Sequence, residues 1–212
     1  MKIRFPHLAG LIISLSIMAS CSEKQQDFPN PMDAKHKHAN KESNLAEYVN
    51  NINSGKIKED TLKGSPEMVA METVGKTHIH INYSAPGVKK RQIWGGLVSY
   101  GQVWVTGAHN ATKINISHEI KIDGKTIPAG EYAFFTIPDH YTWKVILNKN
   151  ANQHLADNYS EKEDVARFDV TPELNTNFVP RLRYTVEKNS ETEGAIVVEW
   201  EKVKVTLPFT SK

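Results

Sequence analysis

Two short polar segments carry the side chains that come nearest to an acid–base constellation. His109 and Asn110 follow Gly107 in the first segment, and His154 and Asp157 lie in the second. An imidazole titrates near neutral pH, so His109, His154 and Asp157 together would suit general acid–base catalysis in a hydrolase-like enzyme. The sequence contains no Gly-x-Ser-x-Gly elbow, HExxH helix, phosphate loop or dinucleotide fingerprint. Without a nucleophile motif we assign no catalytic residue, and the hydrolase stays an alternative hypothesis.

Arg91, Trp94 and Trp104 offer a different chemistry. A guanidinium beside an indole can clamp an anion or stack on a sugar ring. The simpler interpretation is a solvated basic turn next to a core tryptophan, and we favour it for Arg91 and Trp94. For His109 and Asn110, a binding loop and a loop that only caps its own backbone are equally good interpretations. The predicted ligand-binding residues are Arg91, Trp94, Trp104, His109, Asn110 and His154.

His78 and His80 are two residues apart in an alternating stretch, a spacing that can chelate copper or zinc. Specific metal sites usually need three or four ligands, and the sequence shows no clear third one. We therefore interpret these histidines as the polar face of a half-buried strand. We expect no zinc or copper(II) site tighter than about micromolar and no cofactor; metal binding is a weaker alternative.

Cys21 is the only cysteine in 212 residues, and its position indicates an anchor. Residues 1–20 begin with Lys2 and Arg4, continue with an apolar stretch and end in small residues, as in a secretory signal peptide. The last residues before Cys21 resemble a bacterial lipobox, which implies cleavage before Cys21 and attachment of fatty acyl chains such as palmitate. Each buried methylene contributes about 0.8 kcal/mol, so several chains hold a protein on a membrane almost permanently.

The mature chain is electrically neutral. Of 26 basic side chains, Lys2 and Arg4 lie in the signal sequence, which leaves 24 basic against 24 acidic side chains. This balance gives no electrostatic reason to bind nucleic acid. We expect a protein of the cell envelope, anchored at the outer membrane or the periplasmic face rather than the cytoplasmic membrane. Its partner would be a small molecule, a glycan or an envelope protein.

The composition divides the chain into three parts. Residues 1–20 are the signal peptide, and 21–67 are polar enough to predict a flexible lipidated tether with at most a short helix near Leu45–Val49. Residues 68–212 form one domain, which is large enough to stabilise itself without disulfides.

The domain is predicted to be all-β. Thr77–Tyr83 alternates isoleucines with polar residues, and further stretches of this kind follow, separated by turn signals such as Asp123-Gly124. Many short strands favour an antiparallel β-sandwich, with a β-barrel-like fold as the alternative. The alternation changes phase between Trp200 and Val203, which predicts a β-bulge or a bend near Glu201-Lys202. The predicted strands are Thr77–Tyr83, Leu97–Thr106, Thr112–Ser117, Glu119–Ile122, Glu131–Ile137, Trp143–Asn148, Val165–Val170, Arg181–Glu187, Ala195–Glu201 and Val203–Leu207.

Leu97–Thr106 has a glycine, Gly101, in its middle. If the chain turns at Tyr100-Gly101, this stretch becomes a hairpin of two short strands. Arg91 and His109 would then lie at the same end and could share one concave site.

Several segments in order resemble the domain-of-unknown-function family 2911. They include Tyr83-Ser84-Ala85-Pro86, Ile93-Trp94-Gly95-Gly96-Leu97, Ile127-Pro128-Ala129-Gly130-Glu131-Tyr132 and Trp143-Lys144-Val145-Ile146-Leu147-Asn148, within a match from about Val69 to Phe209. The resemblance implies a β-rich exported protein and brings no established activity or catalytic residues. Many members have Arg after the tryptophan at Trp104 and Asn-Glu at His109-Asn110. This chain has Val105, His109 and Asn110 there, so a charged site built from those family residues is not expected.

The leading hypothesis is therefore a lipid-anchored envelope protein whose single β domain is a non-enzymatic binding module. Loops on a rigid sandwich are the usual place for such binding.

Overall fold

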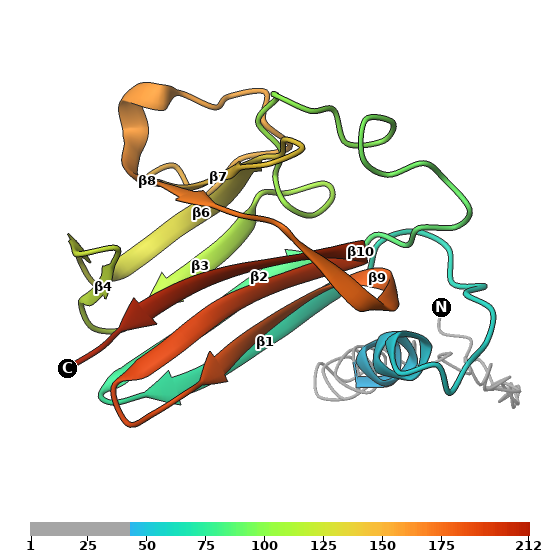
Figure 1. Ribbon diagram of the computed structural model, residues 1–212, viewed down its shortest axis with the longest axis horizontal. Coiled ribbons are helices and arrows are strands. Elements are labelled where there is room, and N and C mark those ends of the chain that lie inside the picture. Colours follow the sequence, from blue (N-terminus) through green and yellow to red (C-terminus); the bar gives the residue numbers. More distant parts are fainter. Residues whose placement is uncertain (1–42) are drawn as a thin grey trace, which may run out of the picture.

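The computed structural model describes residues 43–212, and this part of the chain is an all-β sandwich of two antiparallel sheets (Figure 1). The order is β1-β2-β3-β6-β7-β8 in the larger sheet and β5-β4-β10-β9 in the smaller one. Both sheets are open, so the predicted sandwich is confirmed over the barrel. The strands are β1 (Glu67–Val74), β2 (Thr77–Ser84), β3 (Thr112–Ile116), β4 (Ile120–Ile122), β5 (Lys125–Ile127), β6 (Gly130–Ile137), β7 (Trp143–Asn148), β8 (Asp164–Val170), β9 (Glu173–Lys188) and β10 (Glu193–Thr210).

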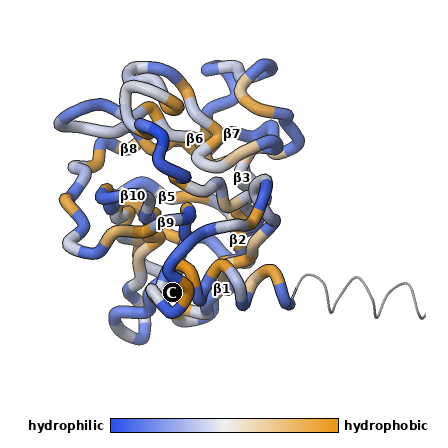
Figure 2. The backbone as a smooth tube through the Cα atoms, turned by 90° about the vertical axis from the view of Figure 1, so that its right-hand side faces the viewer, coloured by the Kyte–Doolittle hydropathy of each residue, from blue (hydrophilic) through white to orange (hydrophobic). Residues whose placement is uncertain are grey.

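Alternate residues of the strands fill the space between the sheets. In β2 the side chains of Ile79, Ile81 and Tyr83 are buried, whereas His80 and Asn82 lie on the other face. Burying one such apolar side chain stabilises the fold by about 1.5–3 kcal/mol. The changes between orange and blue along the tube in Figure 2 follow this alternation. The predicted half-buried strand at Thr77–Tyr83 is confirmed.

The predicted β-bulge interrupts the longest strand. β10 pairs with β9, and the register shifts on both sides of Glu201, whose φ is 57°. Ile196 and Trp200 are buried before the bulge, and Val205 is buried after it. One extra residue reverses the inward phase, so both halves of β10 face the same core.

Residues 43–66 of the polar N-terminal segment pack against the sandwich. A helix covers residues 43–53, with Val49 and Ile52 buried. The Asn53 carboxamide donates to the Arg181 carbonyl (3.0 Å) and accepts from the Arg181 amide (2.9 Å), as a strand neighbour would. The structure therefore differs from the expected flexible tether over residues 43–66. The sequence allowed a short helix near Leu45–Val49 but not its docking, for which two apolar residues one turn apart suffice.

A buried ion pair fixes the chain that follows the helix. The Arg181 side chain is fully buried, and its Nε lies 2.9 Å from Asp60 Oδ2, close but without hydrogen-bond alignment. Its Nη1 donates to the carbonyls of Gly64 (3.1 Å) and Ala85 (2.9 Å). The guanidinium thus joins residues 60–64 to β9 and to the end of β2.

The predicted strand at Leu97–Thr106 is wrong. The predicted turn is present, since Gly101 has a φ of 70°, but no hairpin of two strands forms around it. Trp104 instead makes an isolated bridge to Thr136 of β6, with N–H···O distances of 2.8 and 3.0 Å. Left-handed backbone at Gly101 is incompatible with a continuous strand, so residues 85–111 form a long loop beside the larger sheet.

A second, smaller core lies on the outer face of the larger sheet. Ala133, Phe135 and Ile146 point away from the main core and are covered by Val105 and Ala111. This cover extends over β6 and β7 only. On β1, Val69 is 48% exposed and Met71 is 58% exposed, so the outer face of that end of the sheet is open.

In the part of the chain that the structure describes, no helix has the length and apolar character to cross a membrane. The signal sequence and Cys21 lie outside the described residues.

Candidate functional site

The two tryptophans of the predicted binding set are packed against other tryptophans. The ring centres of Trp94 lie 5.9 Å from Trp104, 4.9 Å from Trp143 and 5.9 Å from Trp200. Trp104 and Trp200 are stacked at 5.7 Å. Trp143 and Trp200 are buried, as predicted for core residues. Packing therefore accounts for the positions of all four rings.

The Arg91 side chain forms hydrogen bonds within its own loop. Its Nη2 donates to the carbonyl of Gly87 (2.5 Å) and its Nε donates to the carbonyl of Val88 (3.3 Å). Among the described residues, no hydrogen bond or ion pair joins Arg91 to His109. The contacts of Arg91 thus match the basic-turn interpretation, and the shared site with His109 has no contact that supports it.

The two polar loops do meet. Asn110 and His154 form an isolated β-bridge, and the amide of Leu155 donates to the His109 carbonyl at 2.7 Å. These contacts are made by the backbone, and the side chains of both histidines are exposed. No side-chain hydrogen bond within residues 43–212 joins His109, His154 and Asp157. The arrangement the hydrolase hypothesis requires is therefore not formed by these three side chains.

A groove of about 940 Å³ lies at the open side of the sandwich. It is lined by five consecutive residues of β1 (67–71) and four consecutive residues of β9 (183–186). Consecutive strand residues have side chains on opposite faces of the sheet, yet all of them line the groove. The groove therefore runs along the edges of the two strands and not over one face of either strand. We call it the edge groove. The N-terminal helix and Asn110 also line it, and Asn110 is the member of the predicted set found there.

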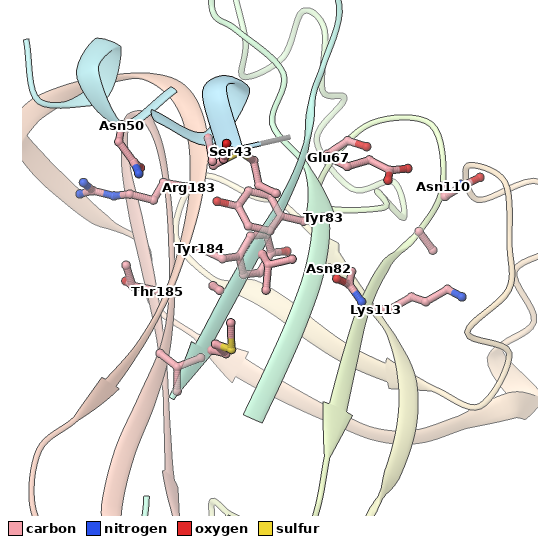
Figure 3. A pocket seen from close by; sticks show the side chains of 18 residues that line it. Ser43, Asn50, Glu67, Asn82, Tyr83, Asn110, Lys113, Arg183, Tyr184 and Thr185 are labelled. Atoms are coloured by element: carbon pink, nitrogen blue, oxygen red, sulfur yellow. The ribbon is translucent and has the colours of Figure 1, made fainter. Parts of the chain in front are cut away.

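The floor of the edge groove is aromatic and uncharged. The rings of Tyr83 and Tyr184 are 4.8 Å apart, and the Tyr184 hydroxyl donates to the Thr106 carbonyl at 2.9 Å. Burial raises the pKa of both phenols above the ordinary value of 10.0. Figure 3 shows these two rings at the centre, surrounded by Ser43, Asn50, Arg183, Glu67 and Asn110.

Both cations that line the groove already have acidic partners. Arg183 donates to Glu199 Oε2 from Nε (2.9 Å) and Nη2 (2.5 Å), and Lys113 lies 3.9 Å from Glu131. An anionic ligand would have to compete for these charges. The groove is therefore suited to an uncharged, partly apolar chain.

The edge of β1 is open for pairing. Val74 and Thr77 flank a two-residue hairpin turn, so they form a hydrogen-bonded pair. The next pair, Thr73 and His78, is a non-hydrogen-bonded pair, and the two kinds alternate along the strands. By this alternation the amides of Val69, Met71 and Thr73 point away from β2. The Thr73 amide accordingly donates to the Glu72 side chain at 2.8 Å. Val69 and Met71 thus present unpaired backbone groups toward the groove.

This edge carries two exposed charged residues, Glu67 and Glu72, but lacks other devices that protect an edge. β1 contains no proline or lysine, and its pairing with β2 runs through eight residues without a bulge. The sequence reasoning missed this edge, because the predicted domain began at residue 68, one residue after the start of β1, and no strand was predicted there. The alternation of Met68, Ala70 and Val74 was the available signal.

No group of three or more His, Cys, Asp or Glu side chains in the described range is placed to hold a metal ion. His78 and His80 lie together on the outer face of β2, with ring centres 6.4 Å apart.

The comparisons with known proteins give one match. The family model described as "Protein of unknown function (DUF2911)" matches residues 65–209, which include β1 to β10 up to Phe209. Neither the curated proteins nor the solved structures include a match to this chain.

Proposed function

We propose that this chain, which belongs to the DUF2911 family, is a lipid-anchored envelope protein whose sandwich binds an extended peptide segment of a partner. The observation that carries the proposal is the edge groove, where the unpaired edge of β1 faces the edge of β9. The signal sequence and Cys21 support the anchored location.

Strand addition explains why the ligand would be a peptide. An extended chain beside β1 can form main-chain hydrogen bonds with the outward groups of Val69 and Met71. Its alternate side chains would lie over Tyr83 and Tyr184 on the inner side and beside the exposed Val69 and Met71 on the outer side. A glycan could stack on the tyrosines, but it has no regular series of N–H and C=O groups with which to pair along the edge of β1.

The test uses random-sequence peptides displayed on phage and selected against the full chain. We expect enrichment of segments with alternating apolar residues and no proline in the centre. Selected peptides should lose binding to Val69→Pro, which removes one outward amide that β2 does not use. Val69→Lys, which adds a charge at the edge, should weaken binding as well.

The matched control is Val69→Thr, which keeps the amide and the branched shape and should retain binding. Circular dichroism and thermal melting establish that each variant is folded. Peptides that bind Val69→Pro as tightly as the unmodified protein would remove the strand-addition model, and so would a selection without enrichment.

A further inference from the structure

The outer face of β1 and β2 gathers two imidazoles on one strand. His78 and His80 are separated by one residue, so both side chains leave the same face of β2. Their ring centres are 6.4 Å apart with an interplanar angle of 40°. Both rings can reach one ion, since each metal–nitrogen bond adds about 2 Å to the reach of a ring.

Met71 supplies the third donor that the sequence did not reveal. It lies opposite His80 in the pairing of β1 with β2. This pair is not hydrogen-bonded, and side chains approach most closely at such positions. Met71 is 58% exposed, whereas Met68 on the inner face of the same strand is 7% exposed. The Met71 side chain is therefore accessible to a ligand from the outer face, whereas that of Met68 is not.

The ring of His78 is already oriented by its own cross-strand neighbour. Thr73 lies opposite His78, and its Oγ1 is 3.0 Å from His78 Nδ1. With Nδ1 occupied, Nε2 is the nitrogen left for a ligand. Metal-binding histidines usually donate their other ring N–H to an oxygen acceptor such as a carboxylate, a backbone carbonyl or water, and the Thr73 hydroxyl can accept in the same way.

We propose that His78, His80 and Met71 form a surface site for Cu(I). A thioether is a soft ligand that favours this ion, and imidazole binds copper as well. Hard cations such as Ca²⁺ and Mg²⁺ require oxygen ligands, and no metal-binding group of three acidic or histidine side chains exists in residues 43–212. Zn²⁺ usually takes four ligands, so three donors with one thioether favour it less. The site does not depend on the peptide-binding proposal.

The experiment is a Cu(I) titration of the full chain against a chromogenic Cu(I) chelator under reducing, oxygen-free conditions. The reference protein carries Cys21→Ser, His36→Ala and His38→Ala, because these residues hold the thiol and the second His-x-His pair. We expect one Cu(I) per chain. His80→Ala should weaken binding by at least the ~10–100-fold that loss of an outer partner costs.

The thioether is tested by Met71→Leu, which should weaken Cu(I) binding and leave the weaker binding of Zn²⁺ unchanged. Met68→Leu is the matched control, because the same replacement on the inner face should leave Cu(I) binding intact. The methyl NMR signal of Met71 should shift on addition of Cu(I). Absence of stoichiometric binding in the reference protein overturns the site, and so does undiminished Cu(I) affinity in Met71→Leu or His80→Ala.

Discussion

At the residue scale, the contacts of Arg181 hold together parts of the chain that are far apart in sequence. Its side chain is fully buried and contacts Asp60 as well as the carbonyls of Gly64 and Ala85. A buried charge is tolerated only with such partners, because desolvation costs several kcal/mol. The guanidinium therefore fixes the path of residues 60–64, together with the amide of Thr61, which donates to the Tyr48 hydroxyl at 2.9 Å.

Asp60→Asn should lower the free energy of unfolding by about 3–5 kcal/mol, because it leaves a buried cation without its counter-charge. Denaturant unfolding of the full chain measures this difference. Asp169→Asn breaks the ion pair with Lys144, in which the Asp169 side chain is 64% exposed and the Lys144 side chain is 47% exposed. This control should cost less than about 1 kcal/mol. Equal effects of the two replacements would contradict a structural role for the buried pair.

Tyr159 makes the fold sensitive to alkaline pH. Burial, with the hydrogen bond and the charge of Asp164, raises its pKa from the ordinary 10.0 to about 12. The folded state therefore favours the neutral phenol. This contribution to stability is complete below about pH 10 and is lost as the pH rises to about 12.

Between about pH 10 and pH 12 the unmodified protein should lose more stability than the Tyr159→Phe variant. Denaturant unfolding midpoints measured at several pH values in this range give the comparison. Tyr141 is 84% exposed, so Tyr141→Phe should follow the unmodified protein. If Tyr159→Phe has the same alkaline slope as the unmodified protein, the phenol does not stay protonated in the folded state.

At the element scale, the N-terminal helix is a docked part of the domain. Ile52 is 2% exposed, and the Asn53 carboxamide pairs with the backbone of β9. Ile52→Ala should lower the free energy of unfolding by about 2 kcal/mol, the lower end for such a replacement because the site lies near the surface.

The comparison is with Glu47→Ala, on the exposed side of the same helix, which should change stability little. Native-state proteolysis should cut Ile52→Ala within residues 43–66 before it cuts the sheets. Equal resistance of both variants would show that the helix does not rely on this contact.

The strands and the bulge were predicted correctly where the alternation of apolar residues along the chain determines the local structure. The bulge at Glu201 was readable because the apolar phase changes between Trp200 and Val203. Leu97–Thr106 was misassigned because its apolar residues are buried one at a time in a loop turned by Gly101. Alternation alone does not distinguish a strand from such a loop.

At the scale of the whole molecule, the edge groove depends on sheet order. The groove-lining residues of β1 (67–71) and β9 (183–186) are more than 100 residues apart in sequence, and only the assembled sandwich brings the two strand edges together. Local periodicity contains no information on this contact. The predicted set therefore met the groove only at Asn110, and the third donor beside His80 became visible only once β1 was paired with β2.

The anchored location rests on Cys21. We expect Cys21→Ser to prevent acylation and to move the protein from the membrane pellet to the soluble fraction in detergent-free fractionation. The reason is that the acyl chains provide the hydrophobic contribution that holds the protein on the lipid. Metabolic labelling with a palmitate analogue checks the modification directly. Label that persists in Cys21→Ser would contradict the assignment of the anchor.

The most direct test of strand addition at β1 is amide hydrogen exchange of the full chain with and without a selected peptide. The amides of Val69 and Met71 point away from β2, so they should exchange rapidly in the free protein and slowly in the complex. The amides of Ala70 and Glu72 bond to β2 and should be protected in both states. Protection that appears elsewhere on binding, with Val69 and Met71 unchanged, would contradict the account.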